Sequence, residues 1–151
     1  MADNATNIFE TMLASLIFNA SSIAGLADND GTSPLTSLSV QLHTASPTDT
    51  GDLTASEATY TSYARVGVER TSSGWTITGS SSATCSVSPT TNITFPQCSG
   101  GTNTITHFSI GNSTVAASTG VMYIYGTVTP NISVSSGVTP RLTTATAITI
   151  T

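Results

Sequence analysis

The stretch Leu42-His43-Thr44-Ala45-Ser46-Pro47-Thr48-Asp49-Thr50-Gly51 decides how this chain folds. Apolar and polar residues alternate before it, over 38–42, and Pro47 ends that strand because proline cannot donate a hydrogen bond to a sheet. The rest of the stretch is a polar, acidic loop that reaches Gly51. Further on, Tyr63-Ala64-Arg65-Val66 alternates again. The segment therefore predicts two strands joined by a long loop, with the second strand returning to a core.

The composition predicts an all-β protein. Thr supplies 30 and Ser 23 of the 151 residues. Thr is β-branched and suits a half-buried pleated surface, while Ser and Gly suit the turns between strands. Apolar residues recur in alternating runs and the net charge is only −5, which is unlike a chain that cannot collapse. This length holds one domain with its own core, so we expect a single domain over residues 1–151.

One segment, 7–18, has the pattern of a short N-terminal helix. Asn7 and Glu10 have the spacing of a capping box, in which two side chains satisfy free amides at a helix start. Six apolar side chains then form a wide face, which we expect to be buried and to anchor the helix on the β domain. Contact with a neighbouring molecule is the alternative. The six residues are Ile8, Phe9, Met12, Leu13, Leu16 and Ile17.

From about residue 35 to the C-terminus, the alternation predicts about eight short strands separated by clusters of Gly, Pro, Ser and Asn. This spacing is typical of an antiparallel β-sandwich. Periodicity alone does not fix the order of the strands in the sheets. The predicted strands are 38–42, 63–68, 75–77, 83–87, 93–95, 105–110, 121–128 and 145–150.

Charge is scarce along the chain. Only 7% of the residues are charged, and the three basic residues are Arg65, Arg70 and Arg141. This balance argues against a nucleic-acid partner, because a phosphate backbone is bound by neutralising it. A surface with few charges suits a permanent interface, since the centres of interfaces are depleted in charge.

No segment predicts export or membrane insertion. The start, Met1-Ala2-Asp3-Asn4, lacks the basic residues and apolar stretch of a secretory signal. The longest apolar run, 12–18, is far shorter than the roughly 20 residues that span a bilayer. We therefore expect a soluble protein, made in a cytoplasm and without a membrane partner.

The candidates for catalysis are few. His43 and His107 are the only histidines, and chemistry at neutral pH would need one of them. Each lies beside a strand residue, and no cysteine or glutamate has the spacing of a shared zinc site. Signatures of serine hydrolases, nucleotide-binding loops and EF-hands are absent. We assign both histidines to packing or to an interface, and expect no catalytic residue, no bound metal and no cofactor.

The loop between the first two strands carries three carboxylates, Asp49, Asp52 and Glu57. Three oxygen donors could hold calcium if the loop curled around the ion, although their spacing matches no defined site. Turns favour Asp in any case. We favour solvation of the loop, or a salt link to Arg65 or Arg70.

Four more segments follow the opening stretch and 63–66 along the chain, in an order known from one protein family. This order resembles a family of small bacteriophage virion proteins, labelled tail-fibre-like and found in some phages as the cement or decoration protein of the capsid. The resemblance implies a jelly-roll sandwich with a structural role and no catalysis. The four segments are Asn92-Ile93-Thr94-Phe95-Pro96, Thr106-His107-Phe108-Ser109-Ile110-Gly111, Gly126-Thr127-Val128-Thr129-Pro130 and Ser135-Ser136-Gly137-Val138-Thr139-Pro140.

From this resemblance we expect a capsid cement protein, a homo-oligomer (dimer or trimer) on the outer head surface that bridges capsomers, with the major capsid protein as its partner. The alternative is a tail-associated fibre or adaptor module that binds host glycans. Sugars usually stack on exposed aromatic rings. The candidates are Tyr60, Tyr63, Trp75, Tyr123 and Tyr125, and we expect Trp75 to belong to the core.

Cys85 and Cys98 are the two cysteines. If 84–87 and 93–95 form a hairpin, position 85 lies opposite about position 94, several residue pairs away from Cys98. A disulfide needs Cα atoms within about 7 Å, and a cytoplasm is reducing. We therefore favour two free thiols over a disulfide.

Overall fold

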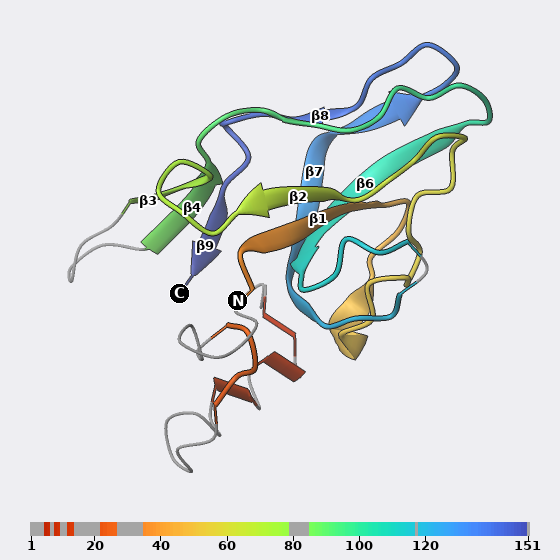
Figure 1. The fold of residues 1–151 in the computed structure, drawn as a ribbon. Helices are drawn as coiled ribbons and strands as arrows, with labels where there is room; N and C mark the ends of the chain where they lie inside the picture. The colour runs from red at the N-terminus through yellow and green to blue at the C-terminus, as the bar shows by residue number, and fades with distance from the viewer. Residues whose placement is uncertain are drawn as a thin grey trace.

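The computed structural model describes residues 5–6, 8–9, 12–13, 22–26, 35–78, 85–116 and 118–150. A four-stranded antiparallel sheet, here the central sheet, lies at its centre (Figure 1). β1 (Ser37–His43) lies between β2 (Val66–Glu69) and β6 (Asn103–Gly111), and β7 (Met122–Val134) pairs with the other edge of β6. The all-β, antiparallel fold class predicted from the composition and the alternation is confirmed.

Two smaller sheets complete the fold. β4 (Cys85–Pro89) lies between β3 (Trp75–Thr78) and β9 (Ile148–Ile150), to one side of the central sheet in Figure 1. β5 (Ile93–Thr94) pairs with β8 (Arg141–Leu142). Within the described ranges, the strands are thus divided four, three and two among the sheets, all with antiparallel pairing.

The main core lies against one face of the central sheet. The alternation of β1 directs Leu38, Val40 and Leu42 to this face, and Val40 and Leu42 pair across with Ile110 and Phe108 of β6. Residues from all three sheets meet there in one cluster. Its buried members are Val40, Leu42, Ala58, Tyr60, Ile93, Phe95, Cys98, Ile105, Phe108, Ile110, Val134, Leu142 and Ile148.

The pairing of β6 with β7 contains a large bulge. Ile105 pairs with Ile132 and His107 with Thr127, so residues 128–131 of β7 stand opposite the single residue Thr106. Pro130 lies in this bulge, where its missing amide costs no ladder hydrogen bond. The bulge explains why β7 continues well beyond the predicted strand 121–128.

Most predicted strands are present, with shifted ends. β8 was not predicted, since two residues are too few to show an alternation. The hairpin considered for 84–87 and 93–95 is wrong. β4 pairs with β3 and β9 instead, and the amide of Thr90 bonds to the carbonyl of Gly74 at 2.9 Å, which extends the β3–β4 pairing rather than turning the chain back.

The described N-terminal residues dock on β7. Ala5 forms a bridge to Ile124, and the buried hydroxyl of Thr6 donates to the carbonyl of Met122 at 2.7 Å. The same hydroxyl accepts the amide of Phe9 at 3.3 Å, so Thr6 has the capping role that we expected of Asn7. Asn7 and Glu10 lie outside the described residues.

The predicted helix 7–18 is described at 8–9 and 12–13, and all four residues are α-helical. Its apolar face is not fully buried as expected. The ring of Phe9 lies 5.3 Å from that of Tyr123, but Ile8 and Leu13 remain 39% and 43% exposed. Leu16 and Ile17 lie outside the described residues. No helix within the described ranges is long and apolar enough to cross a membrane.

Candidate functional site

The second face of β1 is polar and yet buried. Ser39, Gln41 and His43 are at most 1% exposed, and so is Ser109, which lies beside them on β6. Alternation alone would place such side chains in solvent. They are buried because two loops fold over this face. These loops, here the covering loops, are 44–58 and the described residues 112–116 and 118–121.

Backbone hydrogen bonds attach the covering loops to the central sheet. The amide of Ala58 bonds to the carbonyl of Leu42 at 2.8 Å. The first covering loop therefore runs along the same edge of β1 as β2, beyond the residues that pair with β2. The amide of Met122 bonds to the carbonyl of Gly51 at 2.8 Å, and that of Leu53 bonds to Thr119 at 3.0 Å.

Leu53 is the apolar contact between the covering loops and the sheet, and it is fully buried. A Cβ at Gly111 would lie 2.5 Å from its Cδ2 atom and 2.5 Å from the backbone carbonyl oxygen of Val121, so glycine is required there. Gly51 has a φ of 76°, in the left-handed region that favours glycine, and a Cβ there would lie 2.5 Å from Cδ1 of Ile8. The glycine that ends the opening stretch thus allows the loop and the N-terminal segment to meet.

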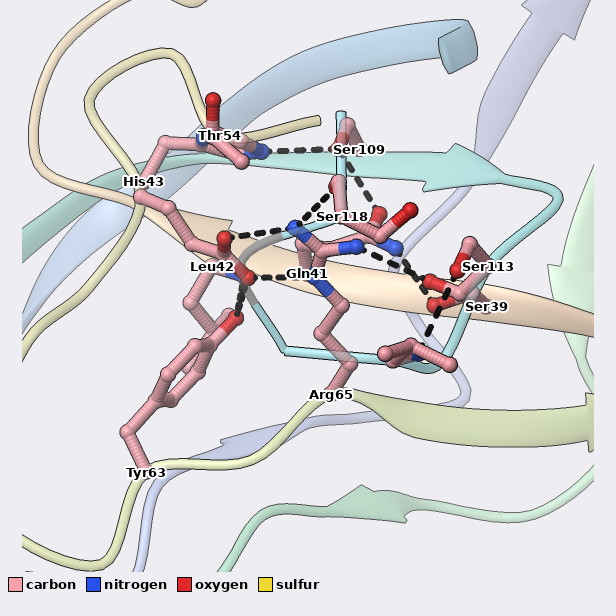
Figure 2. A network of polar contacts seen from close by, with 12 residues as sticks. Ser39, Gln41, Leu42, His43, Thr54, Tyr63, Arg65, Ser109, Ser113 and Ser118 are labelled. Atoms are coloured by element: carbon pink, nitrogen blue, oxygen red, sulfur yellow. Dashed lines mark hydrogen bonds and ion pairs between the residues drawn. The ribbon is translucent and has the colours of Figure 1, made fainter. Parts of the chain in front are cut away.

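A row of hydrogen bonds crosses the buried polar face (Figure 2). His43 Nδ1 lies 2.8 Å from the carbonyl of Ala55 in the first covering loop, and His43 Nε2 lies 2.7 Å from Ser109 Oγ. Ser109 Oγ is 2.9 Å from Gln41 Oε1, and Gln41 Nε2 is 2.5 Å from Ser39 Oγ. The row thus joins β1, β6 and the first covering loop.

An ion pair lies at one end of the same buried polar face. Arg65 is 6% exposed, and its Nε donates to Oε1 and its Nη2 to Oε2 of Glu57, both at 2.7 Å. It also donates to the carbonyl oxygens of Ser113 and Ser118, at 3.1 and 3.0 Å. One guanidinium therefore holds both covering loops. The hydrogen bond to Glu57 raises the pKa of Arg65 above its usual value, and the negative charge of Glu57 adds to this effect against the opposing effect of burial.

Tyr63 takes the place of a missing strand partner. β2 begins at Val66, which pairs with Val40, so the amide of Leu42 has no partner from β2. The hydroxyl of Tyr63 accepts that amide at 3.0 Å and donates to Glu57 Oε1 at 3.1 Å. Burial, followed by the charge of Glu57, raises the pKa of Tyr63 above the usual tyrosine range. Figure 2 shows Tyr63 and Arg65 approaching β1 from the segment before β2.

The contact between Ser109 and His43 has the distance of a nucleophile and its base, but not the surroundings of one. The ring nitrogen that would face an orienting carboxylate faces the Ala55 carbonyl instead. Ser109 and His43 are both fully buried, so no substrate reaches the hydroxyl. The arrangement is suited to holding the covering loops in place.

His107 lies beside His43 in the β1–β6 register but does not join the row. Its Nδ1 lies 2.8 Å from the hydroxyl of Thr106. Burial lowers the pKa of His107, and burial likewise lowers the pKa of His43, against the hydrogen bond to Ala55 and the charge of Glu57.

The three carboxylates of the first covering loop have separate partners. Asp49 accepts the hydroxyl of Tyr125 at 2.9 Å, and Asp52 accepts the amide and hydroxyl of Thr54, both at 2.8 Å. Glu57 pairs with Arg65, as one of our alternatives predicted. Within the described part of the chain, no three His, Cys, Asp or Glu side chains group as metal ligands.

The other residues that the sequence singled out have structural roles where the structure describes them. Arg70 donates to the carbonyl oxygens of Gly25, Leu26 and Leu35, at 2.8, 2.8 and 2.6 Å, and so ties the segment before β1 to the end of β2. Cys98 is a buried free thiol, as predicted. The side chain of Cys85 lies outside the description.

Trp75 packs against the core, as predicted. It lines an apolar cavity of about 600 Å³, together with Leu38, Ile77, Ile124 and other apolar side chains. Its ring nitrogen has no hydrogen-bond partner among the described atoms.

The family model described as podophage GP4 fiber I protein gp80 matches residues 12–151. The chain belongs to this family. The match to the fiber I protein family spans the central sheet, the covering loops and both smaller sheets. A search of curated proteins finds no match. The expectation of a phage virion structural protein is therefore confirmed at the level of the family.

Proposed function

We propose that this chain is a structural subunit of a phage tail fibre, which holds its neighbours through broad, weakly charged contacts. The observation that carries the proposal is the match of residues 12–151 to a fibre protein family. Capsid cement, which we expected from the sequence, becomes the second candidate, because a charge-poor surface suits a head lattice as well as a fibre.

The distribution of charge supports a role in permanent contacts. Glu57 and Arg65 pair inside the molecule, and Asp49, Asp52 and Arg70 bond to other parts of the chain. Among the charged residues that the structure describes, Glu69 and Arg141 are the exposed ones. A partner that covers such a surface displaces water from hydroxyl groups and few ions, so little ion desolvation opposes the contact.

The placement of the aromatic rings favours a structural role over glycan recognition. Every Trp and Tyr of the chain lies in the described residues, and none of them is exposed. Tyr60 and Tyr123 are 3% and 5% exposed. A sugar that stacks on an aromatic face needs that face at the surface. We therefore propose that the subunit builds the fibre and that receptor recognition belongs to another component.

Location and copy number on purified particles test the proposal. An affinity tag on the full chain, imaged by gold labelling, should place the protein on the tail. Quantitative mass spectrometry should find far fewer copies than of the major capsid protein. Labels spread over the head, in numbers comparable to the major capsid protein, would overturn the fibre assignment in favour of cement.

A further inference from the structure

We propose that the row Ser39–Gln41–Ser109–His43 is a proton-sensitive device, in which uptake of one proton by His43 reverses every donor and acceptor in the row and turns over the carboxamide of Gln41. This device is independent of where the protein sits on the particle.

The Ala55 carbonyl fixes one end of the row. A carbonyl oxygen carries no proton, so His43 Nδ1, at 2.8 Å, must donate to it. In the neutral ring Nε2 then has no proton and accepts. The group within hydrogen-bond distance of Nε2 is the Ser109 hydroxyl, at 2.7 Å, which must donate its single proton there.

The rest of the neutral row follows from this choice. With its proton directed to His43, Ser109 has lone pairs toward Gln41, so Gln41 must present its amide nitrogen to Ser109. Its carbonyl oxygen then faces Ser39, whose hydroxyl donates to it. Each contact has one donor and one acceptor, and His43 is neutral.

Protonation of Nε2 reverses the row. Nε2 now donates to Ser109, and the Ser109 proton turns to Gln41, which must present its oxygen. Gln41 Nε2 then donates to Ser39, and this is the orientation seen in Figure 2, with Ser109 donating to Gln41 Oε1. The oxygen and nitrogen of a carboxamide occupy nearly equivalent positions, so a half-turn of Gln41 converts one state into the other.

The surroundings set the cost of the charged state. Burial opposes the imidazolium, as do the charges of Arg65, before β2, and His107, on β6. Glu57, in the covering loop, and the Ala55 carbonyl favour it. The protonated ring therefore shares Glu57 with Arg65, the residue that holds both covering loops.

Nuclear magnetic resonance on the ¹⁵N-labelled full chain tests this device. At neutral pH, above the ordinary histidine pKa of about 6.5, we expect His43 as the Nδ1–H tautomer. On acidification the side-chain amide signals of Gln41 should shift with the same midpoint as His43. The exposed Gln97, whose amide donates to the Gly137 carbonyl, is an internal control and should not follow that midpoint.

The variant Ser109→Ala removes the link in the row, so the Gln41 signals should no longer follow His43. An Nε2–H tautomer at neutral pH would overturn the proposal, as would Gln41 signals that stay fixed while His43 titrates, or that still follow it in Ser109→Ala. Unfolding of the domain before His43 titrates would also overturn it. If Ser109→Ala does not fold, the wild-type tautomer and the Gln41 signals decide alone.

Discussion

Both faces of the central sheet are buried along β1, but different interactions stabilise them. On one face apolar side chains pack against the two smaller sheets; on the other, hydrogen bonds and one ion pair hold the covering loops. The first face has Val40, Leu42, Phe108 and Ile110 at its centre, and the second has Ser39, Gln41, His43 and Ser109.

This difference shows where the chain places its few charged groups. Glu57 and Arg65 lie in the polar layer, so they stabilise the inside of the molecule rather than contacts outside it. Within the described part of the chain, Glu69 and Arg141 are the charged residues left exposed. The two faces can be compared by substitutions that remove one kind of interaction at a time.

The largest effect is expected from the ion pair. Glu57→Gln removes the charge that compensates a buried guanidinium, and breaking a buried pair on one side costs about 3–5 kcal/mol. The measurement is urea unfolding. Glu69→Gln, the same change at an exposed position of β2, is the control, with an expected change within about 0.5 kcal/mol. Equal stability of the two variants would show that the ion pair contributes nothing to the free energy of unfolding.

A substitution that leaves a cavity in the apolar face should also lower the stability. Leu42 is fully buried, and Leu42→Ala should lower the free energy of unfolding by about 2–5 kcal/mol, from lost burial and an unfilled space. Ile77→Ala removes the same number of carbon atoms from a side chain that is 71% exposed and should cost far less. A small effect of Leu42→Ala in the same urea experiment would contradict a close-packed face.

The hydrogen-bonded row should be less costly to break. Ser109→Ala removes the partner of Gln41 Oε1 and of His43 Nε2 in a buried site, which costs about 1–3 kcal/mol. Ser136→Ala changes an exposed hydroxyl and should be neutral. If Ser109→Ala is also neutral in thermal and urea unfolding, the polar face contributes no net stability.

The pH dependence of stability should come from the polar face. Burial holds the pKa of His43 below its ordinary value, so the unfolded chain binds the proton more tightly. The free energy of unfolding should therefore decrease as the pH falls below about 6.5 and level off below the folded pKa. His107, also lowered in pKa by burial, adds to the same slope. Comparing the pH profiles of His43→Gln and His107→Gln separates the two, and the larger flattening is expected for His43→Gln.

The sequence was sufficient to predict the apolar face but not the polar one. The alternation of Leu38, Val40 and Leu42 shows which side chains share a face, since the period of a strand is two. It does not show that the covering loops bury the other face, because those contacts join residues far apart in the chain. A salt link from the loop that carries Glu57 to Arg65 or Arg70 was one of the alternatives predicted, beside solvation of the loop and a calcium site. The role of the Tyr63 hydroxyl as a partner of β1 was not predicted, because it depends on where β2 begins.

The most direct test of the whole account is release of the protein from purified particles. Salt weakens contacts between exposed charges, with a screening length of about 3 Å at 1 M ionic strength, whereas urea weakens apolar and hydrogen-bonded contacts. Since Glu69 and Arg141 are the exposed charged residues of the described chain, we expect the protein to stay on the particle in high salt and to be released by urea. Release by salt at neutral pH, with the particle otherwise intact, would contradict this result and show that charged contacts hold the subunit in place.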